Sequence, residues 1–119
     1  LASTGEVVPL HGDLHHDNIV GGASHWRAID PKGLLGDPHY EVANVFRNPH
    51  GADELALRAG RINRLADTFG DRLGWDAHRV LRWAAVHSAI SAIWDVSAGR
   101  PFEFELKIVP ALFAAVDRR

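Results

Sequence analysis

The sequence contains no cysteine, which excludes disulfide bonds, thiolate metal sites and a thiol nucleophile. It also has no excess of basic residues, because 13 Lys and Arg stand against 15 Asp and Glu, with a formal net charge of −2. Proteins that hold a phosphate backbone usually carry a basic surface, so we expect no nucleic acid partner. Long apolar runs of the roughly 18 residues that a membrane span needs are missing, and residues 1–10 lack the pattern of a signal peptide. We therefore expect no membrane association and a cytoplasmic location.

Methionine is absent as well, and the sequence opens at Leu1, so we expect it to be cut from something longer. Its 119 residues suit one domain or part of one. With 46% hydrophobic and 24% charged residues, the chain has enough apolar surface to bury a core.

The pattern predicts a mainly α fold with a small β-hairpin. Val7–Leu10 is a short apolar strand that ends at a loop, and residues 18–20 and 25–29 flank a Gly-Gly-Ala-Ser turn typical of a hairpin. Prolines and glycines predict a loop after Asp30. Helical spacing then predicts helices over residues 39–48, 53–73, 76–99 and 101–116.

Two of these helices begin at candidate capping residues, Asp53 and Asp76, and Gly99 suits the end of the third. Pro101 suits the first turn of the last helix, whereas Pro110 should kink or divide it. The third helix should be the most buried, with His87 as a satisfied core histidine. Its predicted buried stripe is Val80, Trp83, His87, Ile90 and Trp94, and we expect all four tryptophans mainly in the core.

The residues that indicate chemistry lie between Leu10 and Gly33. Residues 10–20 read LHGDLHHDNIV, and residues 28–33 read AIDPKG. A strand, an H-G-D loop, an Asn five residues after the Asp, and a hairpin that ends in a second Asp form the layout of a phosphotransfer site. Such chemistry needs one carboxylate to orient a hydroxyl and hard oxygen ligands for Mg²⁺. Asp13, Asn18 and Asp30 supply those oxygens.

This pattern resembles the aminoglycoside phosphotransferases of the kinase-like fold, whose catalytic loop reads H-G-D-x-x-x-x-N. The phrases HGDLHHDN, WRAIDPKG and LLGDPHYEVAN look most like the branch of streptomycin 6-phosphotransferase and hydroxyurea phosphotransferase. The resemblance implies that Asp13 is the catalytic base and that Asn18 and Asp30 bind Mg²⁺. It also implies ATP as co-substrate, and streptomycin-like aminoglycosides or hydroxyurea as substrates, with antibiotic resistance as the result.

Other residues receive supporting roles. His11 should brace the catalytic loop, and so should Glu41, which stands where the family usually has Asp. His15 and Lys32 are candidates for a phosphate or substrate contact. A polycationic aminoglycoside would need an acidic wall, for which the late helices offer Asp95, Glu103 and Glu105.

The kinase-like nucleotide lobe has no counterpart here, because neither a G-x-G-x-x-G loop nor a V-A-I-K-like strand precedes the catalytic loop. The resemblance therefore implies that residues 1–119 are part of a C-terminal lobe, with the catalytic loop at 10–20, the metal-binding loop at 28–38 and a helical part at 39–119. Residues 1–5 would end an earlier helix. We expect the isolated chain to be inactive and to self-associate through uncovered apolar surface.

Four alternatives remain at this point. The same loop serves kinases of choline, thioribose and other metabolites, since a fold does not fix a substrate. His15, His16 and Asp17 resemble a metal cluster. Asp13-x-His15 followed by Gly36-Asp37 resembles a metallophosphoesterase, although the G-N-H motif that should follow is absent. Finally, the chain could be a helical interaction module without activity.

Overall fold

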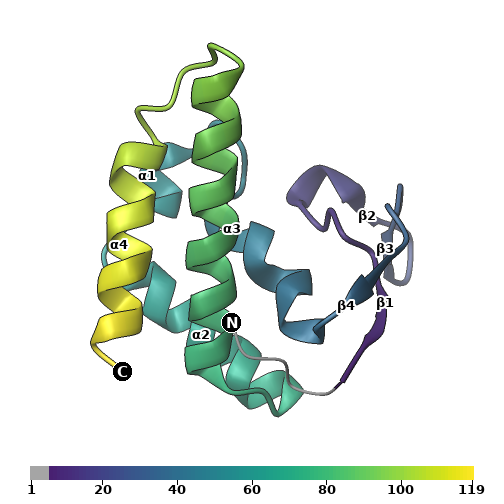
Figure 1. The fold of residues 1–119 in the computed structure, drawn as a ribbon. Helices are drawn as coiled ribbons and strands as arrows, with labels where there is room; N and C mark the ends of the chain where they lie inside the picture. The colour runs from purple at the N-terminus through teal and green to yellow at the C-terminus, as the bar shows by residue number, and fades with distance from the viewer. Residues whose placement is uncertain (1–5) are drawn as a thin grey trace.

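The computed structural model describes residues 6–119, and the expectation for residues 1–5 lies outside this range. The described chain is mainly helical, with strands at one end and helices at the other (Figure 1). Its α-helices are α1 (Asp53–Ala56), α2 (Arg61–Leu73), α3 (Ala77–Ser97) and α4 (Glu105–Asp117). Two 3₁₀ helices, η1 (His16–Asn18) and η2 (Pro38–Arg47), complete the helical part. Among residues 6–119, no helix combines the length and apolar character needed to cross a membrane.

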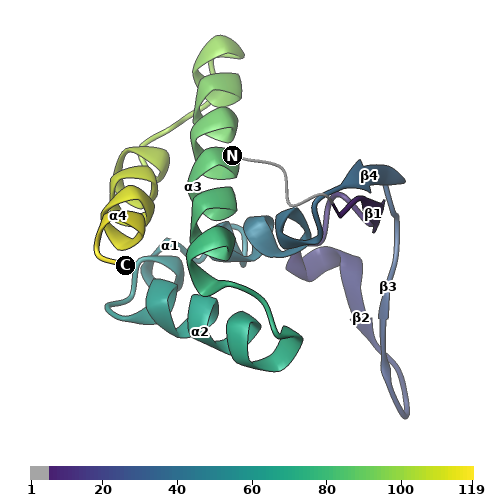
Figure 2. The same ribbon diagram turned by 60° about the horizontal axis from the view of Figure 1, so that its bottom comes forward.

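Two small antiparallel sheets carry the candidate catalytic loop. Strands β2 (Ile19–Gly21) and β3 (Trp26–Ala28) form the predicted hairpin, in which Ile19 pairs with Ala28. It extends away from the helices (Figure 2). Strand β1 (Val8–Leu10), where a strand was predicted, pairs with β4 (Leu34–Gly36). The prediction of a loop throughout 31–38 was therefore wrong, because this segment contains β4.

The core forms where η2 and α4 pack against α3. Its largest fully buried side chains include Phe46 of η2, Leu81 of α3, and Ile108 and Leu112 of α4. The predicted capping of α3 by Asp76 is confirmed, since its side chain accepts a hydrogen bond from the backbone N–H of His78 at 2.9 Å. Helix α3 also ends as expected, with Gly99 in the left-handed region at φ 69°.

The prediction of one helix over residues 53–73 was wrong. Gly60 adopts a left-handed φ of 79°, which only glycine accepts easily, and separates α1 from α2. Asp53 is the first residue of α1 rather than its cap, and Ala52 before it makes no side-chain capping bond. The last helix begins at Glu105 rather than at Pro101, and it continues through Pro110 without dividing.

The predicted buried stripe of α3 was wrong toward its C-terminal end. Ile90 and Trp94 are 42% and 62% exposed, and Trp26 of the hairpin is 75% exposed. The inward face of α3 carries Val80 and Leu81 near its start and then small side chains, which allow η2 and α4 to approach closely. Its buried residues are Val80, Leu81, Ala84, Ala85, Ser88 and Ser91.

Candidate active site

The H-G-D loop is tied to η2 by the side chain of Glu41. Its Oε2 accepts a hydrogen bond from the backbone N–H of His11 at 2.7 Å, and its Oε1 accepts one from Gly12 at 3.0 Å. Gly12 has a left-handed φ of 87°, and a Cβ there would lie 2.9 Å from the side chain of Leu34. Both the conformation and the close approach therefore require glycine at this position.

His11 links the two ends of the site. Its Nε2 lies 2.5 Å from the carbonyl oxygen of Ile29, and its Nδ1 accepts from the backbone N–H of Asp13 at 3.2 Å. A carbonyl can only accept, so this pattern corresponds to a neutral imidazole with its proton on Nε2. Ile29 precedes Asp30, so the ring connects the loop of Asp13 with the loop of Asp30.

Asp13 is partly buried, and two basic side chains approach the same carboxylate oxygen. Oδ2 of Asp13 lies 3.6 Å from Nε2 of His15 and 4.0 Å from Nζ of Lys32. Oδ1 makes neither contact. A carboxylate with one oxygen turned to an imidazole and an ammonium group can still accept, through its other oxygen, a proton from a hydroxyl placed beside it.

Asn18 is buried, and its amide nitrogen is used inside the loop. Nδ2 donates to the backbone oxygen of Asp13 at 2.9 Å and lies 3.2 Å from Nε2 of His15. The amide oxygen of Asn18 makes no hydrogen bond with residues 6–119. The backbone N–H of Ile29 donates to the carbonyl of Asn18 at 2.8 Å, which places Asn18 beside the residue that precedes Asp30.

The donor set of Asn18 and Asp30 suits Mg²⁺. One amide oxygen and one carboxylate are hard ligands, and Mg²⁺ usually binds one or two protein carboxylates, with phosphates and waters filling the remaining positions. Asp30 is exposed and has a left-handed φ of 55°, unusual for a non-glycine residue. In the described range, no group of three or more His, Asp or Glu side chains is placed to hold a metal ion. His15, which the alternative metal cluster would use, instead caps η1 by accepting from the backbone N–H of Asp17 at 3.2 Å.

Asp37, which the sequence suggested only as part of the metallophosphoesterase alternative, is a central residue of the site's support. Its Oδ1 accepts from the backbone and ring of His39, and its Oδ2 accepts from Nε of Arg79 at 2.7 Å and from Nε1 of Trp83 at 3.0 Å. Burial alone would raise the pKa of Asp37, but these hydrogen bonds together hold it well below its usual range. Asp37 therefore joins the start of η2 to α3.

Tyr40 and His87 contact each other close enough to the H-G-D loop to feel the charge of Asp13. The Tyr40 ring meets Trp83 and His87 edge-on, with centroid distances of 5.6 and 5.8 Å. Burial raises the pKa of Tyr40, and the negative charges of Asp13 and Glu41 raise it further. His87 is not the satisfied core histidine that was predicted, because its buried Nδ1 has no hydrogen-bond partner among residues 6–119. Burial and the charge of Arg47 lower the pKa of His87 to about 4, so it is neutral at pH 7.

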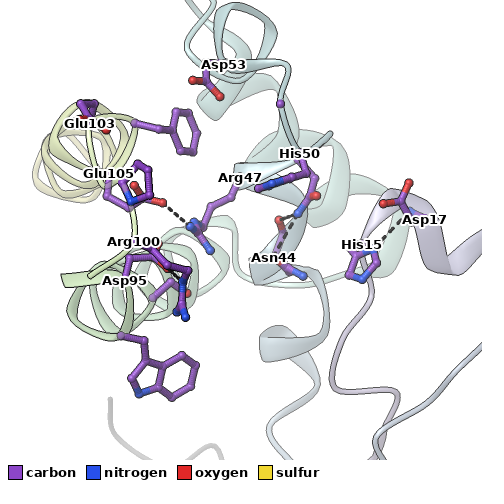
Figure 3. A pocket seen from close by; sticks show the side chains of 16 residues that line it. His15, Asp17, Asn44, Arg47, His50, Asp53, Asp95, Arg100, Glu103 and Glu105 are labelled. Atoms are coloured by element: carbon purple, nitrogen blue, oxygen red, sulfur yellow. Dashed lines mark hydrogen bonds and ion pairs between the residues drawn. The ribbon is translucent and has the colours of Figure 1, made fainter. Parts of the chain in front are cut away.

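An open cleft of about 790 Å³ lies between the catalytic loop and the late helices (Figure 3). His15 and Asp17 line one side, and residues from η2, α3 and the start of α4 line the other. Five carboxylates and two guanidinium groups face the cleft, an excess of three negative charges. The carboxylates are Asp17, Asp53, Asp95, Glu103 and Glu105, and the guanidinium groups are Arg47 and Arg100.

The three carboxylates predicted as an acidic wall thus share one cleft, but two of them have cationic partners. Asp95 accepts from Nε of Arg100 at 2.8 Å, and the buried Glu105 accepts from Nη2 of Arg47 at 2.7 Å. Glu103 is exposed. Like Asp17 and Asp53, it makes no ion pair with any of the described residues. Asp17 and Asp53 were not predicted as part of the wall, because they come from distant parts of the sequence.

Comparison with known proteins agrees with the motif and its surroundings. The family of aminoglycoside/hydroxyurea antibiotic resistance kinases matches residues 1–99. The chain is 41% identical over 103 residues to streptomycin 3''-kinase of Klebsiella pneumoniae. This match covers 83% of this chain and 39% of that protein. It is 33% identical over 91 residues to hydroxyurea phosphotransferase of Kitasatospora aureofaciens, covering 76% of this chain and 25% of that protein. Streptomycin 6-kinase of Streptomyces griseus is 29% identical over 92 residues, and the match covers 76% of this chain and 30% of that protein.

The chain therefore belongs to the aminoglycoside/hydroxyurea antibiotic resistance kinase family, and the resemblance inferred from its motifs is confirmed. It spans 25% to 39% of the length of these relatives. No solved structure matches it.

Proposed function

We propose that the protein to which this chain belongs transfers the γ-phosphoryl group of ATP to a hydroxyl of a polycationic small molecule of the streptomycin type, and so gives antibiotic resistance. In this proposal residues 1–119 are part of the C-terminal lobe of a kinase-like fold. The catalytic loop is at 10–20, the metal-binding loop at 28–38 and the helical part at 39–119. The nucleotide lobe comes from elsewhere in the protein.

Asp13 is the catalytic base. As the hydroxyl oxygen of the acceptor bonds to the γ-phosphorus, the bond from that phosphorus to the β–γ bridging oxygen breaks, and the hydroxyl proton passes to Asp13. Asn18 and Asp30 hold Mg²⁺, which neutralises phosphate charge when it is bound. His11 and Glu41 keep the loop in place, because both bond to its backbone.

The observation that carries the choice of substrate is the acidic cleft beside His15. Pockets for small ligands typically measure roughly 300–1,000 Å³, so about 790 Å³ has room for a trisaccharide-like molecule and far exceeds what hydroxyurea fills. An excess of negative charge favours a cationic ligand. Hydroxyurea is neutral and would gain little from these carboxylates. A polycationic aminoglycoside is therefore favoured over hydroxyurea and over neutral sugars.

The complete protein should be tested for ATP consumption with streptomycin, hydroxyurea and choline as acceptors. We expect turnover with streptomycin that weakens at high salt, because salt screens the attraction between the cleft and a polycation. Turnover with hydroxyurea at a comparable kcat/KM would contradict the choice of substrate. Release of phosphate from esters without ATP would instead support the metallophosphoesterase alternative.

A further inference from the structure

The two basic side chains beside Asp13 come from different segments and differ in how they are held. His15 is 27% exposed, caps η1 and contacts Asn18, so its ring is restrained. Lys32 is 62% exposed, and its ammonium group makes only the 4.0 Å contact with Asp13 among residues 6–119. An exposed pair at that distance is worth little free energy, so the Lys32 head can leave Asp13 at small cost.

The base of Lys32 is nevertheless fixed. Its backbone N–H donates to the carbonyl oxygen of His11 at 2.6 Å, and its Cβ would lie 3.2 Å from a Cβ added at Gly12. A mobile cation on a fixed stem next to Asp13 can follow charge that develops near this carboxylate.

Only one of the two residues lines the cleft. His15 lines it, together with the carboxylates that we assign to the acceptor, whereas Lys32 does not line it. Lys32 instead follows Asp30 by two residues, on the loop that we assign to the metal and the phosphates. Under the proposed function, His15 therefore faces the acceptor, and Lys32 lies on the side of Asp13 that we assign to the nucleotide.

We propose that Lys32 is a catalytic residue that binds the oxygens of the γ-phosphoryl group while it passes from ATP to the acceptor. This inference rests on the proposed function. The transferred group spreads negative charge over its three equatorial oxygens, and little covalent work is left for the protein. A cation placed where that charge develops lowers the barrier without taking part in bond making. Asp13 takes the proton, the released ADP keeps the bridging oxygen, and Lys32 takes no part in proton transfer.

The test compares Lys32→Met and Lys32→Arg in the complete protein with Lys107→Met, which removes an exposed lysine of α4 that does not line the cleft. Lys32→Met should lower kcat by roughly 10²- to 10³-fold, the usual effect of losing one transition-state donor, with the KM for streptomycin nearly unchanged. Lys32→Arg should recover part of kcat, and Lys107→Met should behave as the wild type.

A binding measurement separates this inference from the proposed function. With Mg²⁺, streptomycin and ADP, added aluminium fluoride mimics the phosphoryl group in transfer. Lys32→Met should weaken the fluoride-dependent tightening of ADP binding at least tenfold, while its affinity for ADP alone stays as in the wild type. Unchanged kcat and unchanged tightening in Lys32→Met would overturn the role of Lys32. Tightening by aluminium fluoride in a wild type that phosphorylates none of the three acceptors would contradict the proposed substrate but still test Lys32.

Discussion

The carboxylate of Glu41 holds the backbone of His11, 30 residues earlier in the chain, through a hydrogen bond of 2.7 Å. Its second oxygen holds Gly12 at 3.0 Å, so one side chain fixes two consecutive peptide groups next to Asp13. Both oxygens of the Glu41 side chain therefore reach the loop.

Glu41→Gln should therefore destabilise the chain. Glutamine can accept only one of the two hydrogen bonds and turns an amide N–H₂ toward the other donor, which costs about 1–3 kcal/mol of unfolding free energy. Urea unfolding of the 119-residue chain measures this loss, with Glu54→Gln on the exposed face of α1 as control. Equal stabilities of the two variants would show that Glu41 does not brace the loop.

Asp37 makes the stability depend on pH. Because its folded pKa lies below the ordinary value of 3.8, the unfolded chain binds the proton more readily. Its stabilising contribution is complete well above pH 3.8 and is lost as the pH falls from there toward the folded pKa.

Asp37→Asn should cost about 3–5 kcal/mol at pH 7, since it breaks the buried ion pair with Arg79 and removes the negative charge to which His39 and Trp83 also bind. The loss relative to the wild type should shrink as the pH falls below 3.8. Urea unfolding at several pH values measures both effects, with the exposed Asp71→Asn as control. A loss that is the same at pH 3 and pH 7 would contradict the role of the charged carboxylate.

The unpaired carboxylates of the cleft should select cationic acceptors. In the complete protein, Asp17→Asn and Asp53→Asn should each raise the KM for streptomycin about fivefold, corresponding to roughly 1 kcal/mol for an exposed charge contact, and should change kcat less. The matched control is again Asp71→Asn, outside the cleft. An unchanged KM in both cleft variants would remove this surface from the acceptor site.

The isolated chain should self-associate. An apolar groove of about 470 Å³ runs between α3 and α4, and its lining contains one charged residue, Glu105, which is paired with Arg47. Because this single charge is already paired, the same surface of a second copy meets no unpaired like charge, so we propose a second copy as the occupant of the groove. Light scattering over a concentration series should show a dimer that Leu106→Glu dissociates and Leu35→Glu, at the strand end of the molecule, does not. A monomer at every concentration would contradict this proposal.

The hairpin and the start and end of α3 were predictable because their signals are local: a turn sequence between two short strands, Asp76 as cap and Gly99 as terminator. The pairing of β1 with β4 was missed, because Leu34–Gly36 lies among glycines and prolines and gains its strand character from a distant partner. The break at Gly60 was missed for another reason. The apolar spacing continues in phase across it, so periodicity alone gives no sign of the interruption.

The order of Asp13, Asn18 and Asp30 could be read from the sequence, but their surroundings could not. Arg79 and Trp83, which donate hydrogen bonds to Asp37, lie 42 and 46 residues away in the sequence. No local sequence pattern predicts such contacts. The pairing of Glu105 with Arg47 across 58 residues is of the same kind. The sequence therefore indicated acidic residues for the cleft without showing which of them are already neutralised.

The central claim is that Asp13 accepts the acceptor's proton in an ATP-dependent phosphotransfer, and transfer of labelled γ-phosphate from ATP to streptomycin by the complete protein tests it most directly. Asp13→Asn should lower kcat by roughly 10²- to 10⁴-fold and leave the affinity for Mg-ATP nearly unchanged, while the isolated 119-residue chain should transfer no label. Transfer by Asp13→Asn at the wild-type rate, or by the isolated chain, would contradict the account.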